Sequence, residues 1–279
     1  MTNAARLPTL FIPHGGGPCF FMDPMPGTPA GLWDGMAAYL RSIPDTVGPL
    51  PTAVLVISGH WECAQPTVHF GEQHTLYYDY TGFPEHTYRL QWPAKGSPAV
   101  AARVREQLRQ NGFDVAEERE RGLDHGVFIP FKLIYPEADV PVVQLSLQRG
   151  LDSALHFAIG KALEPLRDDG VLIVGSGMSY HNLRKLFVDD PRANEAAEHF
   201  DTWLGETVTA NPELRERRLR DWQAAPGALD AHPRSEHLLP LMVAAGAAGN
   251  DEGQVVYRER LAGKMISGFQ FGAGHLPTI

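Results

Sequence analysis

The sequence predicts an α/β fold in which a central, mostly parallel or mixed sheet is flanked by helices. Two patterns along the 279 residues indicate it: short continuous apolar segments, and segments with apolar residues at helical spacing that alternate with them. Continuous apolar strands are typical of sheets that are covered on both faces, as parallel sheets are. No internal repeat, low-complexity tract or clear linker interrupts the chain. We therefore expect a single domain over residues 1–279.

Five short apolar segments are the predicted strands. The first, residues 8–13, leads directly into His14 and three glycines, and the second, residues 53–58, leads into Gly59 and His60. Glycine permits backbone angles that other residues rarely adopt, so a tight loop can follow each of these strands. The other three predicted strands cover residues 140–147, 171–174 and 265–271.

Four helices are predicted from capping residues and from the spacing of apolar side chains. Ser97 and Pro98 supply an N-cap and a suitable first helical residue. Asp152 or Ser153 caps the second helix, in which apolar residues recur at helical spacing as far as Leu166. The third and fourth helices are predicted at residues 191–208 and 235–248, and the polar residues 211–231, which include Pro and Gly, are predicted to be a surface segment.

The composition excludes several classes of function. Lys and Arg number 24 against 33 Asp and Glu, which gives a formal charge of −9. Nucleic acids and anionic membranes require a dense cationic surface, so neither is expected as a partner. No apolar run approaches the roughly 20 residues of a membrane helix, and the first residues do not have the pattern of a signal peptide. With only Cys19 and Cys63, no disulfide framework is expected, and a cytoplasmic location is the expectation.

Histidines follow the predicted strands. The chain has twelve histidines, and three of the apolar strands deliver one at or shortly after the carboxyl end: His14, His60 and His181. Ligands of open α/β sheets bind at that edge, so these residues predict a metal site there. A single histidine after a strand is more often a structural residue. A structural role is expected for six histidines whose neighbouring residues give no sign of a functional site: His69, His74, His86, His156, His199 and His275.

Five histidines stand in distinctive short sequences. They are His14 before three glycines, His60 in Ser-Gly-His-Trp, His125 in Leu-Asp-His-Gly, His181 in Ser-Tyr-His-Asn, and His237 in Glu-His-Leu-Leu-Pro. Neutral imidazoles suit iron and zinc, and two or three of them with open coordination positions form a catalytic site. Their spacing matches no local metal motif, so they can share one ion only if the fold brings them together.

These five segments together resemble the class III extradiol ring-cleaving dioxygenases of the LigB-type superfamily, in the branch of the DOPA 4,5-dioxygenase-like proteins. The likeness includes further segments at residues 81–84, 92–99 and 142–146, so it spans almost the whole chain in the family's order. It implies an enzyme with Fe(II) that cleaves a small catechol-type aromatic with O2 to a muconic semialdehyde. Zn(II) can occupy such a site in purified protein, but zinc is redox-inert. A monomer and a small homo-oligomer are both compatible with the sequence.

The resemblance also implies roles for individual histidines. His14, His60 and His237 would bind the metal, His181 would be a further ligand or an acid/base, and His125 would be the catalytic histidine. Because many oxygen-activating iron sites use two histidines and a carboxylate, the neighbouring Glu236 is an alternative third ligand. Adjacent residues on a helix point about 100° apart, which favours His237 as the ligand, with Glu236 as its hydrogen-bond partner.

Other residues are weaker candidates for the site. Ser176 and Tyr180 are expected to line the substrate pocket, although Tyr180 is equally a candidate for a packed aromatic residue. Arg184 could bind a substrate carboxylate. Asp124 is expected either to orient His125 or to cap the following helix. Phe83 and Pro84 are expected in a lid loop or in an ordinary turn.

Three competing functions remain at this point. The segment from His14 to Gly17 imitates the oxyanion loop of serine esterases, but the Gly-x-Ser-x-Gly nucleophile sequence is absent from the chain. A zinc-dependent hydrolase on the same scaffold is the main alternative, because the same imidazoles suit zinc. A non-catalytic binding protein is disfavoured because the full set of histidines is present.

Overall fold

Eight strands form one mixed sheet within residues 6–25 and 27–273, the part of the chain that this computed structural model describes. Their order is β4-β3-β5-β2-β6-β1-β8-β7. The strands are β1 (Thr9–Pro13), β2 (Ala53–Cys63), β3 (Thr67–His69), β4 (Ala116–Glu118), β5 (Val142–Gln148), β6 (Val171–Gly177), β7 (Gly253–Leu261) and β8 (Lys264–Phe271). The four central strands β5, β2, β6 and β1 run parallel, whereas β8 and β7 are added antiparallel at one side. The predicted α/β class and mixed sheet are thus confirmed.

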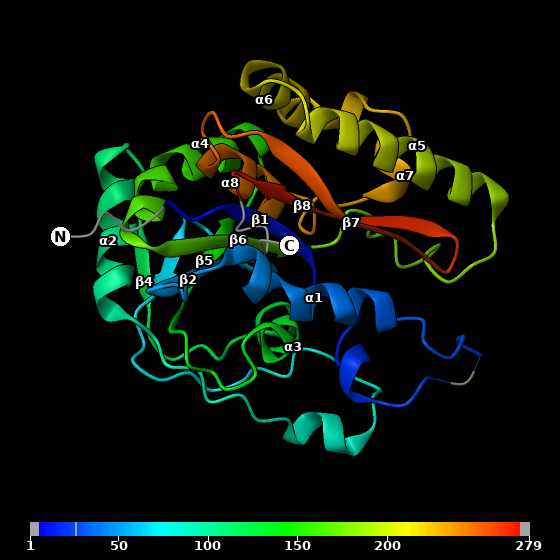
Figure 1. The fold of residues 1–279 in the computed structure, drawn as a ribbon, viewed down its shortest axis with the longest axis horizontal. Helices are drawn as coiled ribbons and strands as arrows, with labels where there is room; N and C mark the ends of the chain where they lie inside the picture. The colour runs from blue at the N-terminus through cyan, green and yellow to red at the C-terminus, as the bar shows by residue number, and fades with distance from the viewer. Residues whose placement is uncertain (1–5, 26, 274–279) are drawn as a thin grey trace.

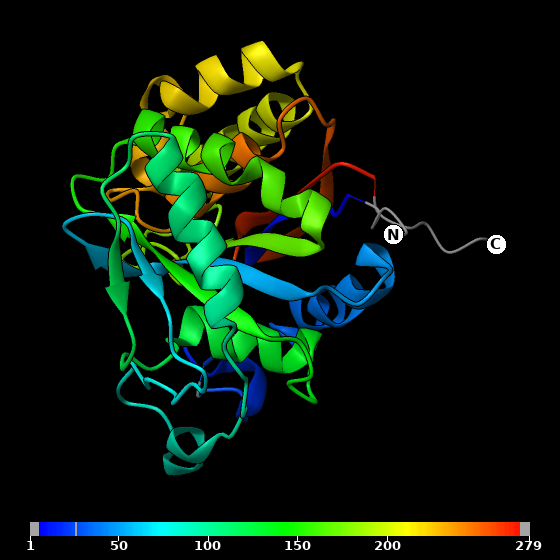
Figure 2. The same ribbon diagram turned by 90° about the vertical axis from the view of Figure 1, so that its left-hand side faces the viewer.

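Helices cover both faces of the sheet (Figures 1 and 2). On one face α1 (Asp34–Val47) packs with α3 (His125–Ile134), and α3 contacts β2 and β6. On the other face α8 (Leu239–Ala247) lies on β6, β1 and β2 and packs against α4 (Ser153–Leu163). The remaining helices are α2 (Pro98–Gln110), α5 (Pro191–Val208), α6 (Pro212–Arg220) and α7 (Ala228–Ala231), with short 3-10 helices at Cys19–Phe21, Glu85–Arg89, Glu164–Asp169 and Trp222–Ala224. Among the described residues, no helix combines the length and the apolar character needed to cross a membrane.

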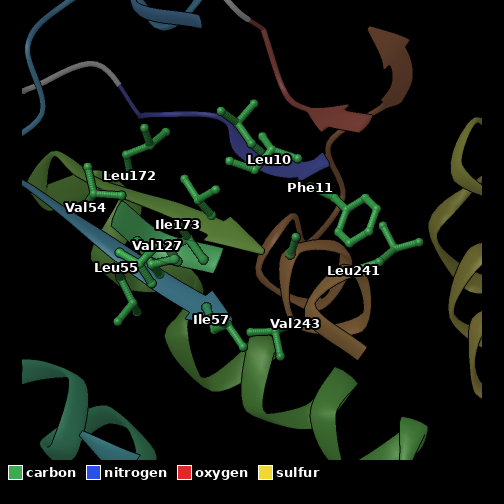
Figure 3. Packing of buried hydrophobic residues seen from close by; sticks show 14 of the residues in the cluster. Leu10, Phe11, Val54, Leu55, Ile57, Val127, Leu172, Ile173, Leu241 and Val243 are labelled. Carbon is green, nitrogen blue, oxygen red and sulfur yellow. The ribbon is translucent and has the colours of Figure 1, made fainter. Parts of the chain in front are cut away.

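The core lies between the parallel strands and these helices. Leu241 and Val243 of α8 belong to the same buried cluster as Phe11 of β1, Ile57 of β2 and Ile173 of β6 (Figure 3). Each of these five side chains is almost completely removed from water. Because burial of one such side chain contributes about 1.5–3 kcal/mol, this cluster fixes the strands whose carboxyl ends carry the histidines.

The predicted starts of the first three helices agree closely with the structure. The Ser97 hydroxyl accepts a hydrogen bond from the Val100 backbone N–H, and the Asp152 carboxylate does the same for Leu155. Helix α4 ends earlier than the apolar spacing suggested, because a 3-10 helix follows it and contains Leu166.

Most residues of the predicted surface segment 211–231 are exposed or half-buried, but the segment is more ordered and packs more closely than predicted. It contains α6, a 3-10 helix and α7, and it buries apolar residues such as Leu219 and Trp222. Helix α6 also buries Arg215, whose guanidinium donates to the carbonyl oxygens of Gly249 and Asp251. A charged side chain is normally a sign of exposure, but the Arg215 guanidinium is buried, with hydrogen bonds from its two terminal nitrogens to backbone carbonyl groups. The polar composition of residues 211–231 therefore underestimates how much of the segment is buried.

Two element boundaries near the site also differ from the predictions. Strand β2 does not end at Ser58 but continues through His60 to Cys63, with a register shift against β5 between Ile57 and Glu62. The fourth helix begins at Leu239, so the residues from 235 to 238 form a turn before it. Glu236 and His237 therefore do not lie on a helix, and helix geometry does not separate their side chains as predicted.

Candidate metal centre

Three histidines from distant parts of the chain meet at the carboxyl ends of the central strands. His14 follows β1 directly, His60 lies in the irregular part of β2, and His237 lies in the turn before α8. One nitrogen of each ring lies within 4.8 Å of the corresponding nitrogens of the other two. The Nε2 atoms of His60 and His237 are 3.1 Å apart. His14 and His237 are almost fully buried, whereas the His60 side chain is 20% exposed.

Glycines let the chain segments approach closely enough for this. A Cβ atom at Gly177 would lie 2.1 Å from the carbonyl oxygen of His237, and one at Gly175 would lie 2.2 Å from that of Pro240. Real Cβ atoms do not occur so close to backbone atoms, so only glycine fits at these two positions of β6. The pattern Gly175-Ser176-Gly177 thus admits the turn that carries His237.

The Nδ1 atom of each of these three rings faces a hydrogen-bond acceptor. His14 Nδ1 donates to the carbonyl oxygen of Gly15 at 2.9 Å, and His237 Nδ1 donates to Glu236 Oε1 at 3.0 Å. His60 Nδ1 lies 3.6 Å from Asp79 Oδ2. Because a carbonyl or carboxylate only accepts hydrogen bonds, these neighbours favour the tautomer with the proton on Nδ1. The three Nε2 atoms are then left with lone pairs.

This arrangement fits a divalent metal ion. The buried His14 Nε2 has no hydrogen-bond partner among the described residues, although such an atom is normally satisfied. Two metal–nitrogen bonds of about 2.1 Å at right angles place their nitrogens about 3.0 Å apart, close to the 3.1 Å between His60 Nε2 and His237 Nε2. Three neutral imidazoles also leave coordination positions open. The cluster could therefore hold a metal with room for further ligands.

The electrostatics keep these imidazoles neutral. Burial lowers the pKa of His14 and of His237 well below 6.5, and the neighbouring histidines lower it further. Burial also lowers the pKa of His60 to about 4, because the effect of the Asp124 and Asp79 carboxylates is too small to offset it. At neutral pH all three are in the deprotonated state that metal binding requires.

His125 stands beside the cluster at the start of α3. Its ring centroid is 3.9 Å from that of His60 and 5.4 Å from that of His14. Its Nδ1 donates to Asp79 Oδ1 at 2.7 Å, and its backbone N–H donates to the same oxygen at 2.9 Å. Burial would raise the pKa of Asp79, but the hydrogen bond and charges of His125 outweigh it, so the pKa is lowered. No sequence pattern pointed to Asp79, which lies in a segment without regular structure.

His181 lies on the other side of His237. The two rings stack with centroids 3.4 Å apart and an interplanar angle of 17°. His181 Nδ1 lies 3.2 Å from Glu236 Oε1, the same oxygen that accepts from His237. The nitrogens of His181 group with Glu236 and His237, but not with the set formed by His14, His60 and His237.

Asp124 has neither of its two expected roles. It makes no side-chain cap of α3, and its carboxylate accepts hydrogen bonds from Ser58 Oγ and Gln144 Nε2, each at 2.6 Å, and from Arg121. Ser58 Oγ in turn accepts from the backbone N–H of His60, and Arg121 donates to the carbonyl oxygen of His60. Asp124 thus holds the irregular part of β2 in place, while Asp79 orients His125.

The candidate substrate residues differ in their surroundings. Ser176 is buried, and its hydroxyl donates to the carbonyl oxygen of Gly126. Tyr180 is also buried, and burial raises the pKa of its hydroxyl. Arg184 is exposed, on the loop that follows His181. The Phe83 ring packs against Gly17: a Cβ atom at Gly17 would lie 2.9 Å from the ring. Phe83 thus covers the glycine segment after His14.

Most other histidines have structural surroundings. His69, His74, His86 and His156 each hydrogen-bond to a backbone carbonyl, His199 is exposed, and His275 lies outside the described residues. His232 has no sequence context that singles it out. It is buried between Phe200 and Trp222 and donates to the carbonyl oxygen of Ser179.

The buried histidines predict a loss of stability in acid. Burial lowers the pKa of both His60 and His232 to about 4, whereas an unfolded histidine has a pKa of about 6.5. The unfolded state therefore binds more protons between these values, so stability is full above pH 6.5 and falls as the pH drops toward 4. At pH 5 each contributes a loss of about 2 kcal/mol relative to pH 7.5. Urea unfolding of the metal-free protein at both pH values measures the loss, and His232→Asn should reduce it. Equal stability at the two pH values would contradict the buried neutral state.

Comparison with known proteins identifies the family of the chain. The family described as the catalytic LigB subunit of aromatic ring-opening dioxygenase matches residues 8–270. The 4,5-DOPA dioxygenase extradiol of Beta vulgaris is 42% identical over 220 residues, which cover 78% of this chain and 81% of that protein. The dioxygenase tasH of Hapsidospora irregularis is 34% identical over 97% of this chain and 87% of its own length.

A solved structure shares the fold. The crystal structure of an uncharacterised Escherichia coli K12 protein superimposes with a TM-score of 0.75 and 28% identity, covering 96% of this chain and all of that one. The family match extends over nearly every element that positions the histidine cluster. The chain therefore belongs to the LigB family of extradiol ring-cleaving dioxygenases, within its DOPA dioxygenase-like branch.

Proposed function

We propose that the protein is an Fe(II)-dependent extradiol dioxygenase that uses O2 to open the ring of a DOPA-like catechol and yields a muconic semialdehyde. The observation that carries the proposal is the convergence of one ring nitrogen each of His14, His60 and His237 within 4.8 Å. The substrate class follows from relatives named as 4,5-DOPA dioxygenases. Both atoms of O2 enter the product, so the reaction needs no external reductant.

We assign His14, His60 and His237 as the metal ligands. Glu236 supports this assignment as the acceptor of the His237 Nδ1 proton, because a carboxylate behind a metal-bound histidine fixes its tautomer and makes it a better ligand. His237 is thus the third ligand, and Glu236 is its partner. When bound, Fe(II) supplies the redox chemistry that joins a catechol to dioxygen, which zinc does not.

We assign proton transfer to the two other histidines near the cluster, His125 and His181. His125 Nδ1 is held by Asp79, so its Nε2 keeps a lone pair and can take a proton from a catechol hydroxyl. We assign His181 as a second acid/base rather than a fourth ligand, because its nitrogens lie outside the three-histidine set. Ser176 and Tyr180 would contribute to the wall beside the substrate, and exposed Arg184 would meet a substrate carboxylate at its outer end.

Anaerobic reconstitution tests the function. Metal-free protein is loaded with Fe(II), mixed with L-DOPA or other catechols, and then exposed to air. We expect one O2 consumed per catechol and a yellow semialdehyde product, and we expect neither with Zn(II)-loaded protein. Ester hydrolysis by the Zn(II) form without oxygen uptake by the Fe(II) form would instead establish the zinc hydrolase.

A further inference from the structure

Asp79 lies close to the ring nitrogens of both His60 and His125. Within residues 6–25 and 27–273, no other carboxylate groups with these two histidines. Asp79 comes from the irregular segment before Phe83, and its side chain is only 11% exposed. Its two oxygens face different imidazoles: Oδ1 accepts from the backbone N–H and Nδ1 of His125, and Oδ2 lies 3.6 Å from His60 Nδ1.

An ionised carboxylate can serve both imidazoles because it only accepts hydrogen bonds. Facing Nδ1 of each ring, it favours a proton on both Nδ1 atoms and leaves both Nε2 atoms with lone pairs. For His60 that lone pair binds a metal, and for His125 it takes a proton. One side chain therefore favours the working tautomer of two residues with different tasks.

We propose that Asp79 is a shared positioning residue, which prepares His60 as a metal ligand and His125 as a base. The proposal rests on the proposed function in its assignment of roles to the two histidines. Glu236 is arranged differently, because a single oxygen of it faces both His181 and His237. The two oxygens of Asp79 instead face different histidines. A substitution that changes only one oxygen can therefore separate the effect on His60 from the effect on His125.

Asparagine offers this separation because an amide has one accepting oxygen and one donating nitrogen. Two N–H groups of His125 converge on the Oδ1 position, so the amide oxygen is expected to remain there. The amide nitrogen then faces His60 Nδ1 as a donor. His60 can respond by moving its proton to Nε2, which removes the lone pair that binds the metal.

The first arm of the test measures metal binding with Zn(II) alone. Loss of such a supporting partner typically weakens metal affinity by about 10–100-fold, and we expect a loss of that size in both Asp79→Asn and Asp79→Ala. The matched control is Asp201→Asn, which alters another buried carboxylate, hydrogen-bonded to Ser267 and Arg258. The control should retain the wild-type Zn(II) affinity. Thermal unfolding of each metal-free variant shows whether a loss of affinity merely follows a loss of fold.

The second arm measures kcat with saturating Fe(II), so that occupancy no longer limits the rate. Asp79→Asn should keep kcat within a few-fold of wild type, because His125 is still held. Asp79→Ala should lose at least about 10-fold, since proton transfer by a positioned group is worth about 100-fold or more. Wild-type Zn(II) affinity in Asp79→Ala, or a wild-type kcat in that variant, would overturn the shared role. If Asp79→Ala does not fold, a less than twofold change of Zn(II) affinity in Asp79→Asn overturns it as well.

The two arms also separate this inference from the proposed function. Zn(II) binding does not depend on ring cleavage. Wild-type protein that binds Zn(II) but consumes no O2 with any catechol refutes the dioxygenase assignment, while the affinities of the Asp79 variants still decide whether Asp79 prepares His60.

Discussion

His14→Ala is expected to raise the dissociation constant for Zn(II) or Fe(II) by at least about 100-fold. Metal sites contribute about 10 kcal/mol or more, so one of three ligands accounts for about 3 kcal/mol. The His14 Nε2 atom is buried and has no hydrogen-bond partner among the described residues, so its lone pair is available to a metal. His60→Ala is expected to behave in the same way. Titration of metal-free protein, with bound metal measured after gel filtration, gives the result directly.

His232→Ala is the matched control for this loss. His232 is also a buried histidine, but it packs against Phe200 and Trp222 and donates to the carbonyl oxygen of Ser179. Its substitution should lower the stability of the fold and leave metal affinity unchanged. If His14→Ala retains wild-type affinity while His232→Ala loses it, the ion binds elsewhere and the three-histidine assignment is wrong.

The parallel strands could be predicted because they are buried on both faces. A continuous apolar run as short as residues 53–57 is typical of a strand covered on both faces, and these side chains are indeed fully buried. Capped helices were equally visible, since Asp152 and Ser97 act locally. Helix α6 was missed although Asn211 caps it in the same local way, because its polar composition suggested an exposed segment. The burial of Arg215 depends on hydrogen bonds to carbonyl groups more than 30 residues away. A local pattern cannot reveal such partners.

The same distinction applies to the site. The placement of His14 and His60 followed from strand ends, since the carboxyl ends of parallel strands share one edge of the sheet. The carboxylates that support these histidines could not be predicted in this way. Asp79 stands 46 residues from His125 in the chain, and the contact of Asp124 with Ser58 spans 66 residues. Adjacency suggested that Asp124 orients His125, but a side chain at the start of a helix points where the tertiary structure leaves space and partners.

His125→Ala is expected to keep the fold and the metal while kcat falls about 100- to 10,000-fold, the range for loss of a positioned acid/base. The ring of His125 approaches His60 but is held by Asp79 through Nδ1, so its removal deletes a proton acceptor and no assigned ligand. The measurement is kcat with L-DOPA at saturating Fe(II), with iron content determined on the same sample.

Iron content decides between two explanations of a slow His125 variant. His60 and His125 have ring centroids only 3.9 Å apart and share Asp79, so a change at one can disturb the other. A fall in kcat at full iron occupancy identifies His125 as the base. A parallel fall of iron content and kcat, restored by excess Fe(II), would mean instead that His125 acts through the metal site. An unchanged kcat at full occupancy would remove His125 from the chemistry and leave His181 as the proton acceptor.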